Sequence, residues 1–181
     1  MSIKQLFAGT ALAVVASLST QAADVYVGLA AGASRWSVGD EPGASIDKSD
    51  AGGKITLGVQ FHPNFALEGG YVHLGKAKYQ GAFAGDIKGT GAFVDAVGQW
   101  PLTPEWSALA RMGVFNGKAK GTVSGLGSAS DSGTDLKYGL GLQYALFKTL
   151  AVRAEWERYR FDVFNDKGDV DLWSLGLRIA F

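Results

Sequence analysis

Cysteine is absent from the 181 residues of this chain. Its absence excludes a disulfide framework and any metal site built on thiolates. The charge is also balanced, since 17 basic residues stand against 17 acidic ones, and this balance does not indicate nucleic-acid binding. We therefore expect stability to come from packing and backbone pairing, and we predict no cofactor, no metal and no nucleic-acid partner.

The apolar run near the N-terminus is too short for a membrane-spanning helix. It extends from Leu6 to Leu18, about 13 residues, whereas such a helix needs roughly 20. A single basic residue, Lys4, precedes the run and small residues follow it, which is typical of a secretory signal peptide rather than of a buried helix. We predict a signal peptide over residues 1–22 and one domain over residues 23–181.

Helical periodicity is missing from the remainder, whereas apolar and polar residues alternate along many segments. In residues 54–61, KITLGVQF, the odd positions are apolar and the even positions are polar or glycine. Such alternation is typical of a strand with two different faces. Eight strands are predicted, near residues 24–36, 53–62, 65–75, 90–101, 106–116, 135–146, 150–160 and 171–181.

The connections between these strands alternate in length. Short turns are predicted at residues 62–64, 102–105 and 147–149, and long polar links at residues 37–52, 76–89, 117–134 and 161–170. An up-and-down meander with its turns at one end and its loops at the other gives this alternation. The fold class predicted is therefore all-β, an eight-stranded antiparallel up-and-down transmembrane β-barrel.

Three features favour lipid outside this barrel over a lipocalin with an apolar interior or a soluble β-sandwich. Glycine crowds the polar face, and each apolar stretch spans about nine to eleven residues, the length of a tilted strand crossing hydrocarbon. Aromatic residues also gather at the strand ends, where two membrane-interface girdles are expected. The predicted girdles comprise Phe61, Phe65, Trp100, Trp106, Tyr144 and Phe181 at the turn end, and Trp36, Tyr71, Phe115, Trp156 and Trp173 at the loop end.

Ionisable residues of the opposite parity must then point into the lumen, because an Arg or Lys facing lipid at mid-bilayer costs roughly 2–4 kcal/mol. We expect them to be paired there, since an unpartnered buried charge is costly. The predicted lumen residues are Lys54, Glu68, Asp95, Arg111, Lys137, Arg153, Glu155, Glu157 and Arg178. Eight strands leave an interior that side chains can fill, so a plugged barrel is expected.

Four segments carry a family resemblance: ALEGGYVHLGK, LARMGVFNGKAK, VRAEWERY and WSLGLRIAF. Together they resemble the OmpA transmembrane domain. The similarity is weak and extends over nearly the whole predicted barrel. The resemblance implies a switchable lumen network in which Glu68, Arg111, Arg153 and Glu155 match family positions. Gln143, Ala30 and Val97 stand where the family has charges, so gating is not carried over. The peptidoglycan-binding domain that often follows this barrel in the family is not expected here, so cell-wall tethering is not carried over.

The last predicted strand resembles the signal that barrel-assembly machinery reads. Its outward residues are Trp173, Leu175, Leu177, Ile179 and Phe181. The resemblance therefore implies this machinery as a partner during biogenesis.

Catalytic and ligand-binding alternatives rest on few residues. His73 has outward parity near the loop end, but no serine lies on the neighbouring strand ends to form a nucleophile and base pair. Asp166, Asp169 and Asp171 offer oxygen ligands without the spacing of an EF-hand. Three rim arginines could bind lipopolysaccharide phosphates or extend into water: Arg35, Arg158 and Arg160.

The sequence thus predicts a non-enzymatic, monomeric, integral outer membrane protein that supports the envelope and displays loops for interactions. Its predicted environment is outer membrane lipid and lipopolysaccharide. A narrow ion or small-solute channel is the first alternative, and a lipid A-modifying enzyme that uses His73 is the second.

Overall fold

The computed structural model describes residues 24–37, 45–47, 49–80, 85–123, 127–163 and 166–181. The predicted signal peptide lies outside these described residues. In the part of the chain that is described, no helix is long and apolar enough to cross a membrane.

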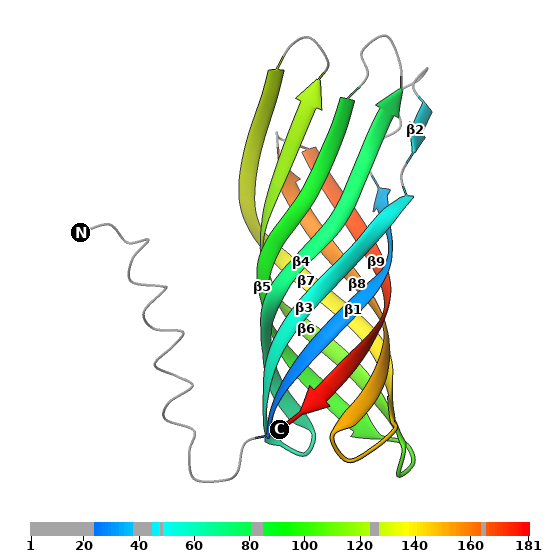
Figure 1. The fold of residues 1–181 in the computed structure, drawn as a ribbon. Coiled ribbons are helices and arrows are strands. Elements are labelled where there is room, and N and C mark those ends of the chain that lie inside the picture. Colours follow the sequence, from blue (N-terminus) through cyan, green and yellow to red (C-terminus); the bar gives the residue numbers. More distant parts are fainter. Residues whose placement is uncertain (1–23, 38–44, 48, 81–84, 124–126, 164–165) are drawn as a thin grey trace, which may run out of the picture.

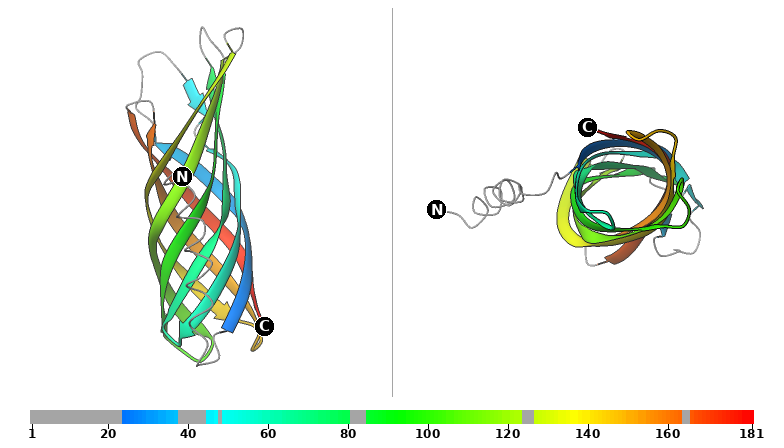
Figure 2. Two further views of the ribbon diagram at one scale, coloured as in Figure 1. Left: turned by 90° about the vertical axis from the view of Figure 1, so that its left-hand side faces the viewer. Right: turned by 90° about the horizontal axis from the view of Figure 1, so that it is seen from below.

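All described elements are strands, and each pairs with its neighbours in the antiparallel direction. They are β1 (Asp24–Ser37), β2 (Ser45–Asp47), β3 (Ser49–His62), β4 (Phe65–Gln80), β5 (Gly85–Pro101), β6 (Trp106–Val123), β7 (Gly127–Ala145), β8 (Leu150–Val163) and β9 (Asp166–Ala180). The strand order is β2-β4-β3-β1-β9-β8-β7-β6-β5, and β5 also pairs with β4. This last pairing closes eight strands into a barrel, seen as tilted strands in Figure 1 and as a ring in Figure 2.

Side chains alternate between the two faces of the barrel wall as the sequence predicted. Leu57, Leu140 and Leu177 point outward and are 58 %, 60 % and 49 % exposed. Lys54 and Glu68, of the opposite parity, are buried inside. A belt of exposed apolar residues this large faces lipid, because in water it would drive association. The predicted transmembrane eight-stranded barrel is confirmed.

The predicted long links are largely wrong, because the strands extend through them. The β5–β6 ladder runs without a break from Pro101↔Ser107 to Gly85↔Val123, and the β6–β7 ladder continues to Val123↔Gly127. Residues 161–170 mostly belong to β8 and β9, and residues 37–52 include β2 and the start of β3. These segments are polar and glycine-rich because they rise beyond the apolar belt, where no apolar face is needed.

A bulge in β4 marks where this strand leaves β3 and pairs with β2. The β3–β4 register ends at Gly53↔His73, and the β4–β5 register shifts between His73 and Lys76. Gly75 lies in the bulge at a φ of 70°, in the left-handed region that favours glycine. Above it, β2 pairs with β4 from Asp47↔Lys78 to Ser45↔Gln80.

The ionic lumen as candidate functional site

Eight charged side chains meet inside the barrel at mid-height. Side chains alternate between the two faces of each strand, and each of these eight occupies an inward position. Four are cations, Lys54, Arg111, Lys137 and Arg153, and four are carboxylates, Glu68, Asp95, Glu155 and Glu157. All eight are buried, so their charges are balanced within a small volume. We call this set the ionic layer.

Arg111 lies at the centre of the ionic layer and contacts all four carboxylates. Its Nη1 atom lies 3.0 Å from Glu68 Oε2, 3.3 Å from Asp95 Oδ2 and 3.4 Å from Glu157 Oε1. Its Nη2 atom pairs with Glu155. A guanidinium has five donors in a fixed planar arrangement, which lets one cation serve several carboxylates.

The two lysines bridge neighbouring carboxylates on either side of this centre. Lys54 Nζ lies 2.7 Å from Glu155 Oε2 and 2.5 Å from Glu157 Oε2. Lys137 Nζ lies 2.6 Å from Asp95 Oδ2 and 2.8 Å from Glu157 Oε1. Each of these two lysines therefore has two partners of opposite sign, which offsets the cost of removing its charge from water.

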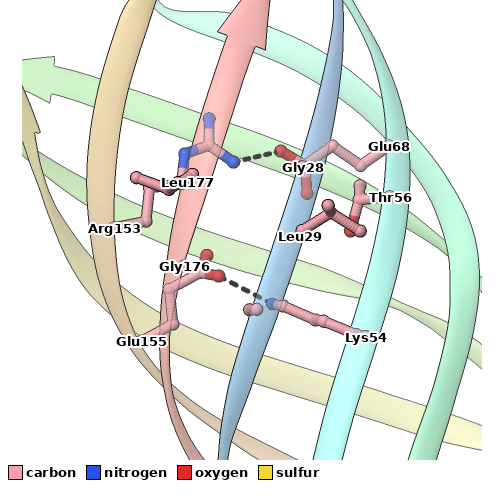
Figure 3. Close-up of a pocket in the computed structure, with 10 residues that line it drawn as sticks. Gly28, Leu29, Lys54, Thr56, Glu68, Arg153, Glu155, Gly176 and Leu177 are labelled. Atoms are coloured by element: carbon pink, nitrogen blue, oxygen red, sulfur yellow. Dashed lines mark hydrogen bonds and ion pairs between the residues drawn. The ribbon is translucent and has the colours of Figure 1, made fainter.

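Arg153 forms the part of the ionic layer nearest the turn end. Its Nη1 atom lies 2.6 Å from Glu68 Oε1, and its Nε–H donates to Gln143 Oε1 at 2.8 Å. The Tyr26 hydroxyl also donates to Glu68 Oε1, at 2.6 Å. Figure 3 shows Arg153 pointing toward Glu68 and Lys54 toward Glu155 around a small cavity. Sequence reasoning missed the tyrosine, whose inward parity on β1 was the available signal.

The structure places Arg178 apart from the other predicted lumen residues. Its Nη2–H donates to Gln60 Oε1 at 2.8 Å, and its guanidinium lies 4.0 Å from the centroid of the Tyr26 ring. Eight of the nine predicted lumen residues thus come together, and Arg178 packs beneath them at the turn end.

A second set of buried side chains fills the lumen on the loop side of the ionic layer. We call it the apolar layer, and it comprises Trp36, Val72, Leu74, Phe93, Phe115, Tyr159, Val170 and Leu172. None is more than 5 % exposed. The rings of Phe115 and Tyr159 meet edge to face, with centroids 5.0 Å apart. This arrangement is favourable for aromatic pairs and leaves the lumen filled.

Two residues of the apolar layer correct the predicted loop-end girdle. Trp36 and Phe115 were expected to face lipid, but they are 5 % and 0 % exposed and lie inside the barrel. Their parity explains the error: Trp36 shares the inward face of β1 with Tyr26, and Phe115 shares that of β6 with Arg111. Of the other predicted girdle residues, Tyr71 and Trp173 are exposed on the outer face, as are most of those at the turn end.

On the outer face near the loop end, charge pairing differs among the three rim arginines. Arg158 binds Asp171 through two hydrogen bonds of 2.7 Å, Nε to Oδ1 and Nη2 to Oδ2. Asp171 belongs to β9, as do Asp166 and Asp169, which were predicted to lie in a long link. Arg35 and Arg160 are exposed.

The residues of the catalytic alternative do not assemble into a site. His73 is exposed on the outer face, and its cross-strand partners are Gly53 and Thr90. Among the described residues, no group of three or more His, Asp or Glu side chains could hold a metal ion.

The last strand presents its apolar side chains on the lipid-facing surface. Trp173, Leu175, Leu177, Ile179 and Phe181 are all exposed. The backbone N–H of Phe181 donates to the carbonyl of Val25 at 3.0 Å, so the barrel seam between β1 and β9 continues to this residue.

A closed antiparallel barrel with an apolar outer belt and a charged interior defines an integral outer membrane barrel protein. The model of the outer membrane protein beta-barrel domain family matches residues 7–181. The chain therefore belongs to this family. No curated protein sequence matches it.

Several solved barrels have the same fold at low sequence identity. Ail, the attachment invasion locus protein of Yersinia pestis, solved with the heparin analogue sucrose octasulfate, is 23 % identical with a TM-score of 0.62, covering 89 % of this chain and 100 % of that chain. Neisserial surface protein A is 15 % identical with a TM-score of 0.64, covering 87 % and 97 %. The N-terminal barrel domain of Pseudomonas aeruginosa OprF is 14 % identical with a TM-score of 0.55, covering 88 % and 99 %.

Proposed function

We propose that this protein is a non-enzymatic, non-conducting outer membrane barrel that supports the envelope and presents its loop end for surface interactions. The observation that carries the proposal is the filled lumen. The ionic layer balances four cations with four carboxylates, and the apolar layer covers it on the loop side. Water and ions would have to displace both layers to cross, and an eight-stranded barrel has little interior space besides.

The envelope role is tested in cells that lack the protein. We expect these cells to take up more of a hydrophobic dye such as N-phenyl-naphthylamine, and expression of the full chain should restore the barrier. Unchanged dye uptake on removal would contradict the envelope role. The matched control is a lipid-facing variant, Leu140→Val, which keeps the outer belt apolar and should restore the barrier equally well.

A narrow channel is the second candidate function, and the cavity in the ionic layer favours it. This cavity has room for about one water molecule and is bordered by the charged groups of Lys54, Glu68, Arg153 and Glu155. Planar-bilayer recordings separate the two functions. We expect no discrete openings from the wild type, whereas openings that Arg153→Ala abolishes or enlarges would favour the channel. Arg153→Lys keeps the positive charge and serves as the control.

A lipid A-modifying activity is not proposed, because the cross-strand partners of the exposed His73 are Gly53 and Thr90, and neither carries a carboxylate. Mass spectra of lipid A from cells with and without the protein should therefore be identical. A change in acyl-chain number that His73→Ala abolishes would overturn this part of the proposal.

Two partners are proposed from the outer face. Lipopolysaccharide phosphates would bind the exposed Arg35 and Arg160, since charge-assisted hydrogen bonds to phosphate suit a guanidinium. The barrel-assembly machinery would bind β9, whose apolar side chains form an exposed row. The protein is proposed to act as a monomer, and Ail supports surface interaction as a use of this fold.

The two proposed partners are tested separately. Lipopolysaccharide binding by the refolded protein should weaken in an Arg35→Ala, Arg160→Ala double variant and persist in Arg158→Ala, because Arg158 already binds Asp171. Equal binding by all three proteins would contradict the phosphate site. For assembly, Phe181→Ala should lower the amount of folded protein in outer membranes without preventing refolding in detergent.

A further inference from the structure

At the turn end of the lumen lies a cation that no carboxylate of the described chain balances. Arg178 takes part in none of the ion pairs between described residues. Glu68, the carboxylate that Arg153 contacts, is already bound by Arg111 and by the hydroxyl of Tyr26 as well. The four cations and four carboxylates of the ionic layer cancel one another, so none of their negative charge is left for Arg178.

The residues that hold Arg178 in place carry no negative charge. Its Nη2–H donates to the side-chain oxygen of Gln60 at 2.8 Å, and its guanidinium lies 4.0 Å from the centroid of the Tyr26 ring. The guanidinium of Arg153 lies 5.2 Å from the same centroid. Two cations therefore lie close to one aromatic ring, and their mutual repulsion favours an anion near them.

Arg178 also leaves hydrogen-bond donors unused. A guanidinium has five N–H groups, and the hydrogen bond to Gln60 uses one of them. The Nε atom is buried and has no hydrogen-bond partner among the described residues, which is unfavourable for a donor. The side chain as a whole is half-buried at the open turn end, so an ion in the water can approach its outer N–H groups. These groups form a planar fork that matches two oxygens of an oxoanion.

We propose that the turn end of the lumen binds a small free oxoanion of the phosphate class, with Arg178 as its main ligand. The anion supplies the negative charge that the surroundings lack, Gln60 positions the guanidinium, and Arg153 attracts the anion from deeper in the lumen. Leu177 and Ile179, the neighbours of Arg178 on β9, are exposed on the lipid face, so Arg178 lies on the other side of the wall from lipid headgroups. This site is independent of the proposed envelope role.

A titration with inorganic phosphate tests binding directly, using the full chain refolded in a maltoside detergent whose headgroup carries no phosphate. We expect the nuclear magnetic resonance signal of the Arg178 Nε–H group to shift with phosphate and to reach a plateau at millimolar concentration. The Nε–H signal of Arg158 is the internal control, because this group already donates to Asp171 at 2.7 Å and should not shift. Chloride at equal ionic strength should bind at least tenfold more weakly, since a single sphere does not match the fork.

A substitution that leaves Arg178 intact tests the missing charge. Gln60→Glu puts a carboxylate of nearly the same shape beside the guanidinium, so the chain supplies its own anion and phosphate affinity should fall at least tenfold. Arg178→Gln removes the cation and should give the same loss. Gln99→Glu is the matched control, since it adds the same charge to a half-buried glutamine that contacts Ser107, and it should bind within threefold of wild type. All three variants should keep the gel shift of a folded barrel when unboiled, which separates loss of binding from misfolding.

Four results would overturn the proposal. One is an Arg178 signal that phosphate does not shift, and another is a Gln60→Glu variant that binds phosphate as tightly as the wild type. Chloride binding as tight as that of phosphate would show attraction by charge alone, without recognition of an oxoanion. Phosphate binding that appears only in Asp24→Asn would mean that the exposed Asp24, which lies opposite Gln60 in the β1–β3 ladder, already fills the site. None of these outcomes bears on the dye-uptake test of the envelope role.

Discussion

The ionic layer and the apolar layer fill neighbouring parts of one lumen by different physical means. In the ionic layer each side chain depends on its partners, since removing one leaves opposite charges buried without compensation. In the apolar layer no partner is required, and the side chains exclude water by volume and contact. Both sets occupy inward positions of their strands. The alternation of side chains in the barrel wall therefore does not determine whether charged or apolar residues fill the lumen.

Lys137 joins the two layers. Its Nζ atom pairs with Asp95 and Glu157 and lies 4.0 Å from the centroid of the Phe93 ring and 4.9 Å from that of Tyr159. Cation–π contacts of this kind are stronger when the cation is removed from water. Lys137 therefore makes favourable contacts with both layers, with the carboxylates of the ionic layer and with the aromatic rings of the apolar layer.

The largest effect is expected from removing the centre of the ionic layer. Arg111→Ala leaves four carboxylates without their shared cation and should lower the free energy of unfolding by about 3–5 kcal/mol. Urea unfolding in lipid vesicles, followed by tryptophan fluorescence, measures the loss. Arg111→Lys keeps a positive charge and should lose less. Equal losses in the two variants would show that charge is not the cause.

The second largest loss of stability is expected in the apolar layer, where a substitution leaves a cavity and not an unpaired charge. Phe115→Ala removes a fully buried ring and its contact with Tyr159, and we expect a loss of about 3 kcal/mol in the same unfolding assay. Phe115→Leu fills most of the space and should lose about 1–2 kcal/mol. A leucine variant as unstable as the alanine variant would contradict packing as the basis of this layer.

Removing the tyrosine hydroxyl that binds the ionic layer should lower the free energy of unfolding less than Arg111→Ala or Phe115→Ala. Tyr26→Phe removes the hydrogen bond to Glu68 and leaves that carboxylate its two arginines. A hydrogen bond to a charged group contributes about 1.5–3 kcal/mol, and we expect a loss near the lower value because of the remaining partners. Guanidinium unfolding of the refolded barrel would measure it, and no change would mean that the hydroxyl does not stabilise the network.

The smallest change in the free energy of unfolding is expected from removing the tyrosine hydroxyl of the apolar layer. The Tyr159 hydroxyl oxygen is buried and has no hydrogen-bond partner among the described residues. Tyr159→Phe keeps the ring and removes this polar group, so stability should stay within about 0.5 kcal/mol of wild type or rise. A loss as large as that of Tyr26→Phe would show that the hydroxyl binds a group in the lumen.

Strand parity in the sequence was enough to predict the fold and to place the charged residues inside. A charge facing lipid is so costly that the positions of Lys54, Arg111 and Arg153 could be assigned to the lumen before any contact was known. Parity could not tell which charges meet, because this depends on the stagger of strands far apart in the chain. Arg178 has the same parity as the others and still lies outside the ionic layer.

The apolar layer was missed because aromatic residues near strand ends were assigned to the girdles without regard to parity. Trp36 and Phe115 are near the loop end, but both alternate in phase with inward residues. Composition was equally misleading above the membrane, where segments such as residues 117–134 are rich in glycine and polar residues. Backbone pairing holds these strands together without an apolar face, and only long-range register reveals it.

Site-directed spin labelling tests most directly whether apolar side chains face lipid and charged ones the sealed interior. The chain has no cysteine, so a single cysteine at Leu57, Leu140 or Leu177 labels one position cleanly. In vesicles we predict strong relaxation by membrane-dissolved oxygen and weak relaxation by a water-soluble nickel chelate at all three positions. The reverse pattern, with access to the chelate and not to oxygen, would place these leucines in the lumen and contradict the structure described.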